Sequence, residues 1–168
     1  MTIKKFTMHD QQVFADLSQD HNPIHTDPKI ARRLIYGQPI VHGLNGLLWM
    51  LSLWAKKKKT PIIILKLNCK FLNPIVLNES VFFVVKMEKN SLVKLEIFQL
   101  EAIVAKIKFE YKKNNRKNYL ITSSLNKPSR KMDVPKKLDE SEMIKQKGVL
   151  ELFLNKNKAI KIYGEHFF

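Results

Sequence analysis

One short segment of the 168-residue chain brings an aspartate and two histidines together with a proline: Ser18-Gln19-Asp20-His21-Asn22-Pro23-Ile24-His25. Pro23 disfavours the helical conformation at the residue before it, so we expect residues 18–28, rich in Asp, Asn, Pro and His, to form a loop. On a helix, Asp20 and His25 would point about 140° apart, whereas a bent loop can bring them together. Because histidine titrates near neutrality, such a pair can hold a water molecule and move protons.

A second segment, Pro39-Ile40-Val41-His42-Gly43, leads into a strongly apolar stretch. If that stretch is a helix, the N–H of Gly43 lies in its first turn, at the positive end of the helix dipole. It has no acceptor within the helix. A glycine allows a carbonyl group to approach closely, and its N–H can stabilise a developing oxyanion. A base, an acid and an oxyanion donor are the groups needed to add water to a carbon next to one that a thioester activates. The same groups can remove water in the reverse reaction.

The elements that must position these residues follow from local patterns. A strand is expected over residues 2–6, and Thr7 with Asp10 three residues later is close to a capping box for a helix that ends near Leu17. A short helix is expected over residues 29–34. The stretch from Gly43 to Ala55 is apolar on nearly every face, which predicts a buried helix.

After Pro61 the pattern becomes typical of β-strands, over residues 62–71, 81–87, 92–100 and 103–111. Short turns separate these segments, so we predict an antiparallel meander. The apolar helix would lie against this sheet, and the sheet would wrap around it. The fold class is therefore α+β.

The composition indicates one globular domain with a tail. Hydrophobic residues make up 45% of the chain and charged residues 27%, which is enough for a core. No run of 18 apolar residues is present, so we expect no membrane-spanning helix, and the first ten residues do not resemble a secretory signal. A single cysteine, Cys69, cannot form an internal disulfide or a cysteine metal cluster, and the cytoplasm is the expected compartment.

The net charge is +15, and it is concentrated toward the C-terminus. Residues 112–168 carry 14 basic and 6 acidic side chains. The change falls near residue 112, so we predict a domain over 1–112 and a basic extension of uncertain structure over 113–168, with a linker at 123–138 and either helix or strands at 148–162. A basic protein attracts phosphate groups, although part of this excess reflects a general abundance of lysine.

The motifs resemble those of the MaoC-like dehydratases, a family that includes the (R)-specific enoyl-CoA hydratases and has the hot-dog fold. The segments that carry the resemblance are Phe14-Ala15-Asp16-Leu17-Ser18, Asp20-x-Asn22-Pro23-Ile24-His25, Ala31 and Pro39-Ile40-Val41-His42-Gly43. The order of the expected elements is also similar. The resemblance covers about residues 1–112, and it is the joined pair of motifs that makes it specific.

The resemblance implies a role for each of six residues. Asp20 and His25 would be the catalytic pair and Gly43 the oxyanion donor. The residues expected at the substrate-binding site are Asn22, which would hold the loop in shape, His42, which would support the start of the helix, and Leu47. No metal and no cofactor is implied, and a metal site of histidines is disfavoured because no second carboxylate or cysteine joins them.

Two positions depart from the family pattern, and one residue has a simpler interpretation. Gln19 stands where the family usually has glycine, and Leu51 stands where some members have serine, with Ser52 beside it. Asp20 could also simply cap the turn that follows it, since Asn-Pro sequences are common in turns.

The resemblance implies a hydro-lyase of fatty acid metabolism that interconverts enoyl and (R)-3-hydroxyacyl thioesters of CoA or acyl carrier protein. It also implies a homodimer in which two hot dogs share one continuous sheet and the acyl chain lies near the interface. Arg32, Arg33 and residues 56–59 are candidates to meet the carrier phosphates. The alternative is a catalytically silent hot-dog module that binds acyl thioesters or a protein partner. A nucleic-acid binder ranks last, because no recognition helix, RNA-binding aromatic motif or zinc ligand set is evident.

Overall fold

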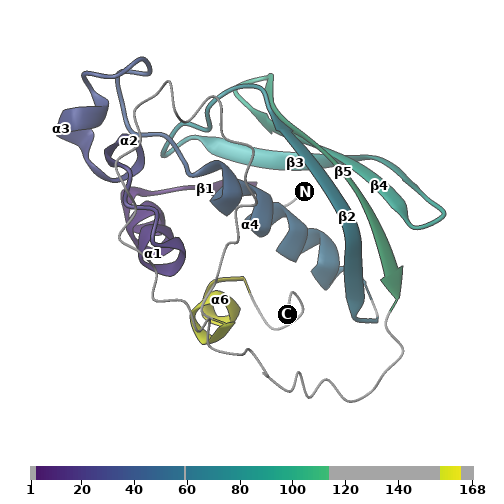
Figure 1. The fold of residues 1–168 in the computed structure, drawn as a ribbon. Helices are drawn as coiled ribbons and strands as arrows, with labels where there is room; N and C mark the ends of the chain where they lie inside the picture. The colour runs from purple at the N-terminus through teal and green to yellow at the C-terminus, as the bar shows by residue number, and fades with distance from the viewer. Residues whose placement is uncertain (1–2, 59, 114–155, 164–168) are drawn as a thin grey trace, which may run out of the picture. The chain divides into compact units, whose positions relative to one another are not determined.

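The computed structural model describes residues 3–58, 60–113 and 156–163 (Figure 1). The predicted linker at 123–138 and residues 148–155 lie outside the described residues. The described part of the segment 148–162 is helical. The elements in chain order are β1 (Ile3–Lys5), α1 (Met8–Ser18), α2 (Pro23–Thr26), α3 (Pro28–Ala31), α4 (Gly43–Lys56), β2 (Ile62–Phe71), β3 (Ser80–Lys89), β4 (Leu92–Gln99), β5 (Ala102–Lys113) and α6 (Lys156–Tyr163).

The predicted cap of α1 is confirmed. The Thr7 side chain accepts a hydrogen bond from the backbone N–H of Asp10, and the Asp10 carboxylate accepts one from the backbone N–H of Thr7 at 2.7 Å. At the other end, Gln19 has a left-handed conformation with φ 62°, which explains why glycine suits this position. The Gln19 side chain donates to the carbonyl oxygen of Asp16 at 2.9 Å, which ties it back to the last turn.

The expectation of a loop throughout residues 18–28 is wrong in its second half, where the structure has the one-turn helix α2 and the start of α3. Asn22 keeps the non-helical conformation that Pro23 demands, with ψ 126°, but its side chain accepts a hydrogen bond from Ile24 N–H at 3.1 Å. A cap followed by proline at the first helical position favours a helix start. The short helix expected to continue to residue 34 ends at Ala31.

Helix α4 supplies the centre of the domain. Its residues Leu47, Met50, Leu51 and Trp54 are buried in one apolar cluster with inward-facing residues of the sheet. The helix is not buried on every side, because Leu44 is 37% exposed. Figure 1 shows the sheet curving over one side of α4, with α1, α2 and α3 gathered at the end where α4 begins.

The sheet is antiparallel, and its strand order is β1-β3-β4-β5-β2. The predicted meander is correct for β3, β4 and β5 and wrong for β2, which pairs with β5 at the far edge, with Leu67 opposite Phe109. The connection from β2 to β3 does not turn tightly. Its residue Ile75 is buried and accepts a hydrogen bond from Val41 N–H at 2.8 Å, so this segment crosses beside the start of α4 and delivers β3 next to β1.

Within the described residues, no helix has the length and the apolar content needed to cross a bilayer.

Candidate active site

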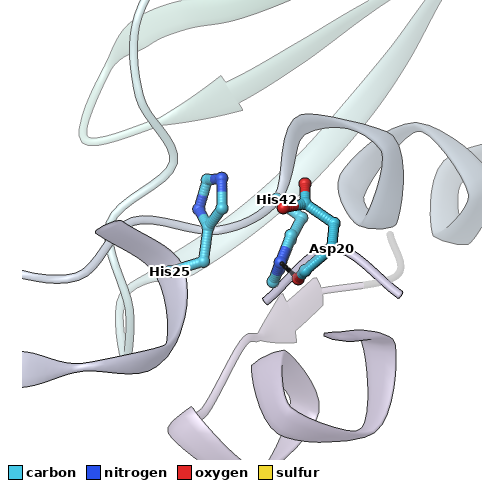
Figure 2. A group of neighbouring side chains, drawn as sticks. All are labelled: Asp20, His25 and His42. Carbon is cyan, nitrogen blue, oxygen red and sulfur yellow. Dashed lines mark hydrogen bonds between the residues drawn. The ribbon is translucent and has the colours of Figure 1, made fainter. Parts of the chain in front are cut away.

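Three side chains from separate segments meet near the start of α4: Asp20 after α1, His25 in α2 and His42 directly before α4 (Figure 2). One nitrogen or carboxylate oxygen from each side chain lies within 4.8 Å of one from each of the others. The structure therefore brings the predicted pair of Asp20 and His25 together, and it adds His42 to them.

His25 is held in a defined tautomer. Its Nδ1 atom lies 2.8 Å from the carbonyl oxygen of Ile40. A carbonyl oxygen only accepts hydrogen bonds, so Nδ1 carries the hydrogen and donates. The neutral ring then keeps its lone pair on Nε2, which is the state of a general base. His25 is half-buried, so the ring is both anchored to the protein and accessible.

Asp20 is the exposed member of these three residues. Its Oδ1 atom accepts a hydrogen bond from the backbone N–H of Asn22 at 3.2 Å. The simpler interpretation, in which Asp20 caps the following turn, is thus compatible with the structure. The same bond orients the carboxylate, and each carboxylate oxygen can accept more than one hydrogen bond. The Asn22 side chain accepts a hydrogen bond from the backbone N–H of Ile24 and caps α2, and its expected role at the substrate-binding site stays a prediction.

His42 is buried, with 2% of its surface exposed. Its ring lies between those of Phe14, at 5.0 Å between centroids, and His25, at 4.0 Å. Its Nδ1 atom is 2.8 Å from Oε1 of Gln11, and its Nε2 atom is 3.0 Å from the carbonyl oxygen of Asp20. Burial lowers the pKa of His42, and the neighbouring His25 lowers it further. Both ring nitrogens of His42 thus face protein oxygens, and its expected support of the helix start at the substrate-binding site stays a prediction.

Gln11 is a site residue that the sequence analysis missed. It is 0% exposed, and its Oε1 atom accepts a hydrogen bond from the backbone N–H of His42 at 3.0 Å in addition to facing the ring. Within the described residues, its Nε2 atom has no hydrogen-bond partner. The available signal was a polar residue on the same face of α1 as Phe14 and Ala15, which are both buried.

Gly43 is the first residue of α4 and is half-buried. A Cβ atom at this position would lie 3.0 Å from two ring carbons of Phe71, at the end of β2. The ring of Phe71 therefore lies against the glycine, and a side chain at position 43 would fit only if this ring moved by a few tenths of an ångström. Its N–H belongs to the first turn, which has no acceptor within the helix.

Leu47 lies in the apolar core, and its expected contact with substrate stays a prediction. Leu51 is buried in the same core. The hydroxyl of Ser52 donates to the carbonyl oxygen of Trp49 at 2.7 Å, so it serves the helix backbone and does not replace a serine at position 51.

Asp20, His25 and His42 are the described residues placed closely enough to be considered for a metal ion. Both ring nitrogens of His42 already face protein oxygens. Two donors then remain, from Asp20 and His25, which is fewer than the three protein ligands typical of catalytic zinc sites. The expectation that no metal is used is therefore kept as a prediction.

Comparison with known proteins decides the family. A family model described as a MaoC-like domain matches residues 2–108. The chain belongs to the MaoC-like family. An (R)-specific enoyl-CoA hydratase of Aeromonas caviae is 44% identical over 41 residues, which span 24% of this chain and 31% of that protein. The aligned part thus covers about a third of that curated relative.

Solved structures show that the MaoC-like domain has the hot-dog fold, as predicted. The (R)-hydratase of A. caviae involved in PHA biosynthesis superimposes with a TM-score of 0.57 at 25% identity, covering 67% of this chain and 92% of that one. An (R)-hydratase of Pseudomonas aeruginosa gives 0.59 at 20% identity, covering 68% and 79%. The family match ends at residue 108, so α6 lies outside it.

Proposed function

We propose that this MaoC-like protein is a hydro-lyase that interconverts enoyl and (R)-3-hydroxyacyl thioesters. The observation that carries the proposal is the meeting of Asp20 and His25 beside the first turn of α4. The similarity to an (R)-specific enoyl-CoA hydratase supports it.

In the hydration direction, the Asp20 carboxylate orients a water molecule and Nε2 of His25 accepts one of its protons. The water oxygen forms a bond to the β carbon of the enoyl group, and the electron pair of the double bond moves toward the thioester carbonyl. The N–H of Gly43 stabilises the negative charge on that oxygen. The catalytic pair then returns a proton to the α carbon, and the carbonyl re-forms. Dehydration is the reverse sequence.

The proposed carrier is CoA or acyl carrier protein, and both attach the acyl group through a phosphate-bearing arm. Lys29, Arg32 and Arg33 are exposed in and just after α3, close in the chain to His25. Exposed cations at this place could pair with the carrier phosphates. A role in fatty acid metabolism and a cytoplasmic location stay predictions of the same kind.

The edge strand β2 supports the proposal of a homodimer. Leu67, Cys69 and Phe71 lie opposite Phe109, Ile107 and Ala105 of β5, which are buried against the core. On β2 this same inward face is only partly covered, since Leu67 is 43% exposed and Phe71 46%. An edge strand with a partly covered apolar face is suited to pairing with another strand, and a second copy of the chain would supply that strand. Because Phe71 lies against Gly43, the interface would border the active site.

The decisive experiment follows the loss of the enoyl thioester absorbance when purified protein is mixed with crotonyl-CoA. We expect Asp20→Asn to lower the rate by about 10²–10⁴ while the circular dichroism and the melting temperature stay close to those of the parent protein. Asp16→Asn is the matched control, because Asp16 is an exposed aspartate on α1 outside the site. Hydration that persists in the Asp20→Asn variant would refute the mechanism.

The contact of Phe71 with Gly43 favours a second candidate, a domain that binds acyl thioesters without turning them over. In that case the ring would keep the carbonyl group away from the donor. Binding of crotonyl-CoA and longer enoyl-CoA substrates, with no hydration by the unaltered protein at any chain length, would favour this candidate over the enzyme.

A further inference from the structure

Helix α6 packs on α1 and α4, two of the helices that position the candidate active site. Ala159 and Tyr163 are one turn apart on α6, and both are buried. They form an apolar cluster with Phe14 and Leu17 of α1, and side chains of α4 pack against this cluster. Helix α6 belongs to the same compact unit as the sheet.

The contact with α4 includes a buried hydrogen bond. The hydroxyl of Tyr163 donates to Oδ1 of Asn45 at 2.8 Å. Burial raises the pKa of Tyr163 well above its ordinary value, so the phenol keeps its proton and remains a donor at physiological pH. Asn45 is itself buried, and it lies two residues after Gly43 in the first turn of α4. The bond therefore acts on the turn that presents the oxyanion donor.

The contact with α1 reaches the other half of the site. Phe14 packs against α6 on one side, and its ring is 5.0 Å from that of His42. His42 in turn meets the carbonyl oxygen of Asp20. Docking of α6 thus supports the loop that carries the catalytic aspartate and the helix start that carries Gly43.

We propose that α6 is a positioning element of the active site and that Tyr163 is its positioning residue, acting through Asn45 on the first turn of α4. The inference rests on the proposed function and goes beyond it, because the family match ends at residue 108 and α6 lies 48 residues further on. Small displacements of a catalytic group lower the rate strongly, so a single hydrogen bond at this turn is expected to affect kcat.

The test uses the full chain with Tyr163→Phe, which removes only the hydroxyl, and Lys161→Ala as the control at an exposed position of the same helix. In hydration of crotonyl-CoA we expect kcat of Tyr163→Phe to fall about tenfold with KM nearly unchanged, and the control to match the parent. In an Asn45→Ala background, Tyr163→Phe should cause no further loss. An unchanged kcat in the single variant, or equal losses in both backgrounds, would overturn the proposal.

Amide hydrogen exchange gives a measurement that does not depend on activity. The N–H of Gly46 donates to the carbonyl oxygen of His42 at 3.2 Å, which is the first hydrogen bond of α4. Tyr163→Phe should speed its exchange by about tenfold, whereas Lys161→Ala should not. Faster exchange in a protein that hydrates neither crotonyl-CoA nor longer enoyl-CoA substrates would leave α6 as an element that positions the start of α4 and would reject the proposed enzyme. Unchanged exchange would reject the role of Tyr163 whatever the activity.

Discussion

The Nε2 atom of His42 lies 3.0 Å from the backbone carbonyl oxygen of Asp20, and this contact joins the loop after α1 to the start of α4 (Figure 2). The other ring nitrogen faces Gln11 on α1. A neutral imidazole has one N–H and can donate to one of these two oxygens at a time. One buried side chain therefore relates the position of Asp20, the proposed catalytic aspartate, to that of Gly43, the proposed oxyanion donor.

Gln11→Leu should destabilise the protein and lower its activity. The substitution removes the acceptor for the backbone N–H of His42, and a buried donor without a partner costs about 1–3 kcal/mol. The free energy of unfolding from urea titration and kcat for crotonyl-CoA measure the two effects. Gln12→Leu, at an exposed neighbouring position, is the control. If Gln11→Leu were as stable as Gln12→Leu, the contact with His42 would be unimportant.

Stability should fall as the pH drops below neutrality. Burial, with a contribution from His25, lowers the pKa of His42 in the folded protein. Below the unfolded pKa of about 6.5 the unfolded chain gains a proton that the folded protein does not, so unfolding becomes more favourable by at most about 1.4 kcal/mol per pH unit until the folded pKa is reached.

Urea titrations at neutral pH and at pH values below 6 test this dependence. The variant His42→Gln should show a smaller loss of stability between the two conditions, whatever its stability at neutral pH. Parallel losses in the variant and the parent would assign the effect to other groups.

Gly43→Ala should impair catalysis more than folding. The new methyl group would meet the ring of Phe71 at 3.0 Å and would occupy space that an approaching carbonyl needs. Alanine keeps the backbone N–H, but its methyl group would hold the carbonyl oxygen away from this donor, so we expect kcat/KM to fall by about 10²–10³. Adding Phe71→Leu should restore the melting temperature without restoring activity. Full recovery of activity in the double variant would mean that only the packing of Phe71 matters.

Gln19→Gly should stabilise the domain. The residue has φ 62°, which costs about 1–2 kcal/mol for a residue with a side chain. Glycine relieves that cost but loses more backbone entropy and, like alanine, the exposed hydrogen bond to Asp16, so a net gain of about 0.5–1 kcal/mol is expected. Gln19→Ala keeps the strain and loses the hydrogen bond to Asp16, and it should be no more stable than the parent. The melting temperature should therefore be higher for Gln19→Gly than for Gln19→Ala. The opposite order would contradict the prediction.

Leu67→Lys should convert the proposed dimer into a monomer. The change places a charge on the partly covered inward face of β2. Light scattering after size exclusion should give a dimer mass for the parent and a monomer mass for the variant. Leu100→Lys is the control, because Leu100 is 67% exposed between β4 and β5. A parent protein that is already monomeric would reject the shared sheet.

Much of the fold could be predicted because it depends on neighbours in the chain. The capping box of Thr7 and Asp10 sets the start of α1, and alternation of apolar residues sets β3, β4 and β5. The path of β2 could not be predicted in this way. A short connection with turn residues is compatible with a hairpin, whereas in the structure Ile75 packs beside the start of α4 and the chain crosses to a position between β1 and β4.

In the candidate site, too, some properties follow from neighbours in the chain and others depend on contacts between distant residues. The sequence alone determined that Asp20 lies in the non-helical segment before Pro23 and that an apolar helix begins at Gly43, since these properties depend on proline, on spacing and on local hydrogen bonds. Only the tertiary structure decided that Gln11 meets His42, that Phe71 lies against Gly43 and that Tyr163 meets Asn45. Those contacts join residues far apart in the chain, and they form because packing around α4 buries their surfaces together.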